Sequence, residues 1–312
     1  MSRSYARVAR LRRFCTTYLF ALAPLAAAVL WGGLYVVSMW GFESIPPVTL
    51  AFLRIAVGAA ALLLVVRVRY PRRRFARRDL LGFVALGAVI TASMTTQFLG
   101  TAMTTASQGS LITVLTPIFT ILLGVTMLGE RLTGRLVAGI VGALAGTVLV
   151  LTGQYDLSTL AGGSTPTIGI GMLLIASATW ALYTVRGKPL IDRYSALETA
   201  TYSTLAAVPM LAALVPLEVA LTDASLRAIE PTPALVAAVL YLGVLGTAAA
   251  WYLWYKGMEY VDASVISAFF FAQPVVGGLL GATVLGEPLG PRFVLGGLVM
   301  AAGVYVVSTA ES

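Results

Sequence analysis

The sequence predicts an all-α membrane protein of ten transmembrane helices, arranged as two inverted repeats of five. Three observations predict this fold: an apolar composition, an asymmetry of positive charge between alternate loops, and an internal repeat. Of the 312 residues, 59% are hydrophobic and only 11% are charged, against roughly 25% charged in ordinary soluble domains. A chain this apolar cannot cover itself with polar surface, so lipid is its expected solvent.

Ten apolar runs approach the roughly 20 residues that cross a bilayer core. They lie at 18–40, 46–66, 80–101, 106–128, 133–152, 168–186, 196–217, 233–255, 263–285 and 292–309. The resulting domain organisation is a basic cytoplasmic tail (1–17), a first five-helix repeat (18–152), a periplasmic linker (153–167) and a second repeat (168–309). The linker is predicted from its cluster of glycine, serine, threonine and proline.

Lysine and arginine are distributed unevenly between alternate loops. With the N-terminus inside, one side receives eighteen of them and the other only Arg227 and Arg292. Because positive loops stay in the cytoplasm, both termini are expected on the cytoplasmic side of a bacterial inner membrane. The apolar run after Arg12 and Arg13 continues to Trp40, which favours a retained helix over a twin-arginine signal peptide. The net charge of +8 falls in strips between apolar runs, which argues against nucleic-acid binding.

An internal repeat relates the two halves. Shifting the chain by 157 residues aligns 106–150 with 263–307 without a gap, and about 18 of the 45 pairs are identical. The identical pairs include Pro117/Pro274, Glu130/Glu287, Arg135/Arg292, Gly139/Gly296 and Gly146/Gly303. Because each copy contains an odd number of spans, the second copy enters the membrane from the opposite side. Inverted repeats of this kind let a carrier alternate between two related conformations around a site near the midplane.

Several short motifs resemble the EamA repeat of the drug/metabolite transporter superfamily. They are Leu30-Trp31-Gly32-Gly33, Pro47 with Ala51-Phe52-Leu53-Arg54, Gly129-Glu130-Arg131, Trp251-Tyr252-Leu253-Trp254-Tyr255 and Gly286-Glu287-Pro288. The likeness covers about residues 20–308, and within the superfamily the chain is most similar to the bacterial ten-helix exporters of aromatic and other neutral amino acids. The resemblance implies a basket of ten helices around a central cavity. It implies that the cavity is lined mainly by the predicted spans 18–40, 80–101, 106–128, 168–186, 233–255 and 263–285.

Aromatic and amide side chains at mid-depth are the candidates for substrate binding. The set is Trp31, Tyr35, Met94, Thr95, Gln97, Trp180, Tyr183, Trp251, Tyr255, Phe270 and Gln273. Aromatics near span ends are usually interfacial anchors, but Trp31 and Trp180 lie too deep for that role. Deep indoles need an N–H partner, and a mostly apolar pocket with a few polar groups is typical of a small-ligand site. Packing against lipid remains the alternative for each residue taken singly.

Pro117 and Pro274 occupy matched mid-span positions. Each removes a helical hydrogen bond and predicts a kink that supports gating. The alternative is that the freed carbonyls, at Thr113 and Phe270, bind substrate or neighbouring hydroxyls.

Arg54 is the one clear charge inside an apolar run. It is interpreted either as an anchor for a substrate carboxylate or gate, or as a structural arginine bonded to helix-end carbonyls. No acidic residue falls near the middle of a predicted span, and there is no histidine. Proton coupling usually requires such a group at the substrate site, so the simplest interpretation is facilitated movement down the substrate's own gradient. Coupling through other groups is the alternative. With Cys15 the only cysteine, metal sites, cofactors and enzymatic chemistry are not expected either.

The sequence thus predicts a monomeric carrier in the bilayer that exports or facilitates passage of neutral, aromatic amino acids. Carriers of lipophilic cations, nucleosides or nucleotide sugars remain alternatives. A cation would favour an acidic pocket and a nucleotide sugar several basic residues. An intramembrane enzyme or sensor is a further alternative, but it lacks catalytic groups and a soluble domain.

Overall fold

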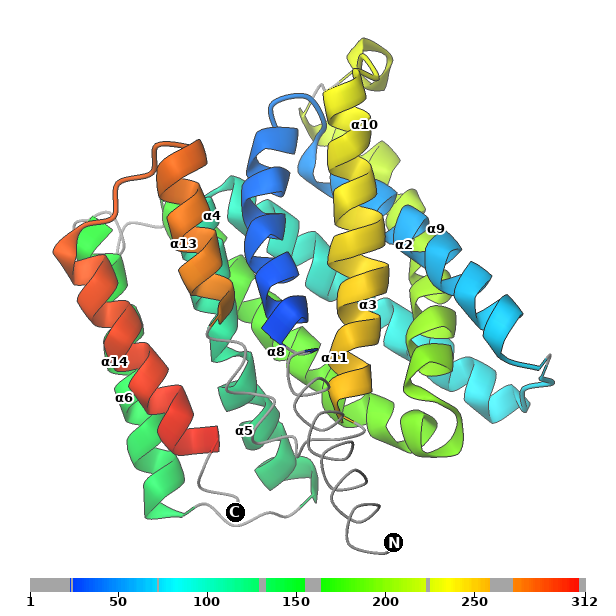
Figure 1. Cartoon of the computed structure of the whole chain (residues 1–312), viewed down its shortest axis with the longest axis horizontal. Helices are drawn as coiled ribbons and strands as arrows, with labels where there is room; N and C mark the ends of the chain where they lie inside the picture. Colours follow the sequence, from blue (N-terminus) through cyan, green and yellow to red (C-terminus); the bar gives the residue numbers. More distant parts are fainter. Residues whose placement is uncertain are drawn as a thin grey trace, which may run out of the picture.

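The computed structural model describes residue 23 and residues 25–71, 73–128, 133–154, 164–222, 225–258 and 272–308. All regular structure within these residues is helical (Figure 1). The first helix is Leu25–Gly41. It is followed by α2 (Pro47–Arg69), α3 (Arg77–Ala102), α4 (Ala106–Ile112), η1 (Thr113–Leu115), α5 (Thr116–Leu128) and α6 (Gly134–Gln154). The second half contains α8 (Thr165–Arg193), α9 (Ala196–Thr222), η2 (Leu226–Ala228), α10 (Pro233–Leu240), η3 (Tyr241–Ala249), α11 (Ala250–Met258), α13 (Ala272–Val284) and α14 (Pro291–Ser308).

Five of the described helices are long and apolar enough to cross a membrane. They are α2, α3, α8, α9 and the continuous helix Pro233–Trp254, which contains α10, η3 and part of α11. Shorter apolar helices occur at Leu25–Gly41, Val137–Gly153, Ala272–Val284 and Pro291–Gly303. The predicted spans at 18–40 and 263–285 begin in residues outside the described part of the chain, so the total of ten spans stays a prediction.

Two helices of the second half extend beyond the apolar runs that predicted them. The run at 168–186 corresponds to α8, which continues through Pro189 to Arg193. The run at 196–217 corresponds to α9, which contains Pro209 and Pro216 and continues beyond the run to Thr222. Charges such as Arg186 end a hydropathic run without ending a helix, and neighbouring helices let a spanning helix tolerate proline.

Carboxylates from the second half cap two helices of the first half. Glu218 of α9 accepts hydrogen bonds from the backbone N–H groups of Val48 and Thr49, both at 2.7 Å, at the start of α2. Glu287 accepts from the N–H groups of Ala106 and Ser107, at 2.8 and 2.9 Å, at the start of α4. A helix N-terminus offers unpaired N–H donors and a favourable dipole to a carboxylate. These contacts therefore join the two halves of the chain.

Helices of the first half pack against helices of the second. The pairs are α6 with α14, α4 with α13, α2 with α9, and α3 with α8; Figure 1 shows α6 (green) and α14 (red) side by side. A side chain on Gly146 would collide with the backbone of Gly296, and one on Gly303 with the backbone of Gly139. The repeat equates Gly139 with Gly296 and Gly146 with Gly303, so these are one contact made twice. A two-fold relation between the copies requires this reciprocity.

Candidate functional site

A small cavity lies among the first helix, α2, α3, α8, α11, α13 and the η1–α5 junction. Its lining consists of Trp31, Leu34, Tyr35, Arg54, Ser93, Met94, Gln97, Thr113, Thr116, Ala176, Ser177, Trp180, Trp251 and Gln273. The volume open to the centre of a water-sized sphere is about 50 Å³, which is room for a few water molecules. The cavity therefore brings together residues from both halves of the chain.

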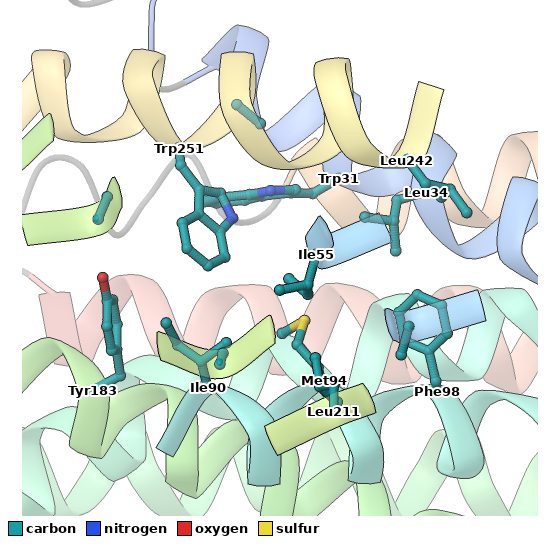
Figure 2. Close-up of a cluster of buried hydrophobic side chains, with 14 of the residues drawn as sticks. Trp31, Leu34, Ile55, Ile90, Met94, Phe98, Tyr183, Leu211, Leu242 and Trp251 are labelled. Carbon is teal, nitrogen blue, oxygen red and sulfur yellow. The ribbon is translucent and has the colours of Figure 1, made fainter. Parts of the chain in front are cut away.

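One wall of the cavity is aromatic. Trp180 of α8 lies with its ring centre 6.4 Å from that of Trp31 and 5.1 Å from that of Trp251. Tyr183 stacks on Trp180 at 5.2 Å, and Trp254 lies 5.1 Å from Trp31. Figure 2 shows Trp251 pointing from one side of this core toward Tyr183 and Met94 on the other. Tilted and edge-on ring pairs of this kind add stability beyond their buried area.

Another part of the lining is a hydrogen-bonded cluster of neutral polar groups. The Tyr35 hydroxyl lies 2.6 Å from the Thr113 hydroxyl and accepts a 2.6 Å hydrogen bond from Gln97 Nε2. Gln273 Nε2 donates to both Tyr35 and Thr113, at 3.2 and 3.1 Å. Four separate helical elements supply these groups, and burial makes their mutual satisfaction important for the fold.

Arg54 reaches this cavity from α2 and is only 2% exposed. Its Nε donates to the Thr247 hydroxyl at 2.9 Å, and its Nη2 donates to the Gly246 carbonyl at 3.4 Å. Both acceptors belong to η3, a π-helical segment, and the Trp31 indole N–H donates to the same Gly246 carbonyl at 3.0 Å. π-Helical turns leave backbone groups available and are frequent at functional sites. Here the turn positions an arginine beside a tryptophan.

Two polar atoms of the cavity lining are buried without a hydrogen-bond partner. One is Nη1 of Arg54, a charged donor, and the other is Oε1 of Gln97, an acceptor. No aspartate or glutamate is among the described residues that line the cavity. Leaving a buried cation without an acidic partner is costly. A ligand carrying both an anionic and a cationic group would satisfy both atoms.

The structure brings many of the predicted site residues together. Trp31, Tyr35, Met94, Gln97, Trp180, Trp251, Gln273 and Arg54 line the cavity. Tyr183 lies behind Trp180, and Thr95 is half-buried on α3 outside the lining. Phe270 and the side chain of Tyr255 lie outside the described residues. The set of cavity helices implied by the resemblance also omitted the second span, which contributes Arg54.

The first of the two prolines follows a break in its helix. Pro117 is the second residue of α5, which begins directly after the 3₁₀ turn η1. The Thr113 carbonyl accepts a 2.7 Å hydrogen bond from the Thr116 hydroxyl, so here the freed carbonyl is bonded to a neighbouring hydroxyl. Pro274 lies in the first turn of α13 as described, and the carbonyl expected to be freed there, at Phe270, lies outside the described residues.

Small polar residues also line the cavity and are not among the predicted site residues. Ser93 and Ser177 lie on the same helix faces as Gln97 and Trp180, one turn away, and Ser93 donates to the Ala176 carbonyl at 3.1 Å. Because residues three or four apart share a helix face, the positions of Gln97 and Trp180 could have predicted that Ser93 and Ser177 face the same cavity. Thr113 and Thr116 carried no such signal, because the 3₁₀ turn changes which side chains face inward.

A bundle of apolar helices around a mixed aromatic and polar cavity defines a polytopic membrane protein with a small-molecule site. The model of the EamA-like transporter family matches residues 17–152 and again 167–309. The chain therefore belongs to the EamA-like transporter family and is a multi-pass membrane protein.

Relatives cover nearly the whole chain. A protein named as an uncharacterized transporter from Archaeoglobus fulgidus is 30% identical over 89% of this chain and 94% of its own length. A "Probable terminal-alkyne amino-acid exporter" from Streptantibioticus cattleyicolor is 27% identical, over 92% of each chain. A "Probable amino-acid metabolite efflux pump" from Escherichia coli is 28% identical over 90% of this chain and 92% of its own. One crystal structure matches with a TM-score of 0.69 at 21% identity, covering 94% of this chain and 99% of that one, which shows a shared fold.

Proposed function

We propose that this chain is a carrier that exports, or facilitates passage of, neutral aromatic amino acids across the inner membrane. The observation that carries the proposal is the pair of unpartnered atoms in the cavity, Arg54 Nη1 and Gln97 Oε1. An amino acid presents a carboxylate to the first and an ammonium group to the second. Charge-assisted hydrogen bonds of this kind are among the stronger polar contacts in proteins.

The aromatic wall supports a substrate with an apolar, flat side chain. Trp31, Trp180 and Trp251 offer ring faces and edges within one cavity. An aromatic pair contributes about 0.5–1.5 kcal/mol beyond area burial, which is enough to favour aromatic over small aliphatic substrates. The cavity of about 50 Å³ has room for only a few water molecules, so its walls separate when an amino acid enters. Trp180, which is half-buried, is the ring with most freedom to move.

The cavity walls would separate during alternating access, when the carrier changes between its inward-facing and outward-facing conformations. The internal repeat and the reciprocal contacts of Gly146 with Gly296 and of Gly303 with Gly139 support ten spans in two inverted copies. In such carriers one copy rocks against the other around a central site. The eighteen-to-two distribution of lysine and arginine supports cytoplasmic termini. The names of the Streptantibioticus and Escherichia relatives support amino acids as the substrate class.

Transport is expected to run down the substrate's own gradient. The chain contains no histidine, and the described cavity lining contains no carboxylate that could bind and release a coupled proton. Purified protein in proteoliposomes loaded with unlabelled substrate should therefore exchange labelled phenylalanine, tyrosine and tryptophan. The exchange rate should be the same with and without a pH gradient.

A panel of substrates in the same counterflow assay separates the alternatives. Alanine, a nucleoside, a nucleotide sugar and a lipophilic cation are assayed beside the aromatic amino acids, with protein-free vesicles as the control. Preferential exchange of the cation or of a nucleotide derivative would contradict the proposed substrate. Accumulation that requires a pH gradient would contradict the proposed absence of proton coupling.

A further inference from the structure

A second and larger cavity lies away from the central site, as a crevice between α3 and α8. Its volume open to the centre of a water-sized sphere is about 450 Å³. Arg78 at the start of α3 and Arg193 at the end of α8 line its mouth together with Arg186, and the apolar side chains of Val89 and Leu182 lie farther from these helix ends. We call it the α3–α8 crevice. Proposed substrate transport makes no use of it.

The α3–α8 crevice opens on the lipid-facing side of the bundle. On α8, Leu182 and Pro189 continue a line of residues spaced by seven that begins with Ile168 and Ile175. Residues seven apart share a helix face, and Ile168 and Ile175 are 48% and 51% exposed. Apolar side chains this exposed on a membrane-spanning helix face lipid.

The α3 side of the crevice also faces lipid. Ala85 lines the crevice and is exposed. Its neighbours Leu81 and Val84 are 69% and 47% exposed. The apolar depth of the crevice is therefore continuous with the surface that contacts acyl chains.

The mouth of the crevice is positively charged. Its one acidic residue among the described lining is Asp79, which pairs with Arg193 and accepts a 2.7 Å hydrogen bond from the Tyr194 hydroxyl. This hydrogen bond raises the pKa of Tyr194, so the hydroxyl stays protonated and donating. With Asp79 compensated, Arg78 and Arg186 leave an excess of positive charge, and both are exposed.

We propose that the α3–α8 crevice binds one anionic phospholipid, with its phosphate between Arg78 and Arg186 and an acyl chain along Leu86, Val89 and Leu182. Arginines at the end of spanning helices lie at the depth of the headgroups. Basic pockets between such helices suit acidic headgroups. A free phosphate would be bound by the same arginines but would leave the apolar depth unfilled, so a lipid matches the whole cavity.

The test measures phosphatidylglycerol retained by the full-length protein after transfer from mixed phosphatidylcholine vesicles, using native mass spectrometry. The Arg78→Gln/Arg186→Gln variant should retain phosphatidylglycerol roughly 25-fold less tightly than the wild type, from about a factor of five per arginine. The matched control is Arg69→Gln/Arg74→Gln, which removes the same charge from exposed positions outside the crevice. Because it leaves both crevice arginines in place, and salt screens exposed charges over about 10 Å, it should retain phosphatidylglycerol close to the wild-type level.

A third variant separates a lipid from a soluble anion. Ala85→Trp fills the crevice from its exposed side and leaves every arginine in place, so it should also weaken retention of phosphatidylglycerol. Equal losses in the two arginine variants, or full retention by Ala85→Trp, would overturn the proposal. Displacement of the lipid by inorganic phosphate alone would also overturn it, since the site would then bind phosphate without a chain.

Discussion

Replacing Arg54 with glutamine is expected to slow exchange of aromatic amino acids by at least about tenfold, because a hydrogen bond to a charged group contributes about 1.5–3 kcal/mol. Arg54 is 2% exposed, and its Nη1 is buried without a hydrogen-bond partner. Removing a buried cation that lacks an acidic partner does not weaken the fold in the way that breaking an ion pair does. Thermal unfolding of the Arg54→Gln protein should therefore stay near the wild-type temperature, or rise.

The specific readout is the discrimination between phenylalanine and phenethylamine, which lacks the carboxylate. Wild-type protein should prefer phenylalanine in competition for counterflow, and Arg54→Gln should lose that preference. Arg54→Lys keeps the positive charge and should keep part of the preference for phenylalanine. Arg54→Gln could instead slow exchange of phenylalanine and phenethylamine equally and unfold at a much lower temperature. Arg54 would then be structural, held by Thr247 and Gly246 alone.

Replacing Trp180 with alanine is expected to reduce exchange of aromatic amino acids by about tenfold, which corresponds to the loss of one or two aromatic contacts. Trp180 lies at the centre of the aromatic wall, between Trp31 and Trp251. Because its side chain is only half-buried, the cost to stability should be smaller than for a fully buried tryptophan. Trp180→Phe should retain most of the exchange rate.

The control for this prediction is Trp40→Ala. Trp40 lies near the end of the first helix, is 37% exposed and does not line the cavity. Counterflow of tryptophan by this variant should match the wild type. An equal rate in Trp180→Ala and Trp40→Ala, with both proteins folded, would show that the aromatic wall does not contact substrate.

Much of the helical layout follows from the sequence, because a helix that crosses lipid must satisfy its own backbone and be apolar along its length. Part of the site could also be predicted from the sequence, because polar and aromatic residues stand out within apolar helices. Trp31 and Trp180 are too deep for interfacial anchors, and Gln97 is an unusual residue inside an apolar run. Each of these signals is local to one helix, and all three residues line the cavity.

Contacts between distant segments could not be predicted in this way. The partners of Arg54 lie about 190 residues away in a π-helical segment, and no local pattern in the sequence indicates π-helical geometry. The repeat did mark Glu287 through its identity with Glu130, but not its partner. In the structure Gly286, with φ of 68°, ends α13 and turns Glu287 toward the start of α4. The Gly286-Glu287 motif therefore joins the two halves of the chain.

The central claim, that substrate occupies the cavity lined by Arg54 and Trp180, is tested most directly by substrate protection of a cysteine placed there. Cys15 is the only cysteine, so Ser177→Cys in a Cys15→Ser background introduces one thiol into the lining. Saturating phenylalanine should slow its reaction with a water-soluble thiol reagent by about tenfold, by mass action. The exposed loop variant Ser44→Cys should react at an unchanged rate. Unprotected labelling of Ser177→Cys in proteoliposomes that transport phenylalanine would contradict the account.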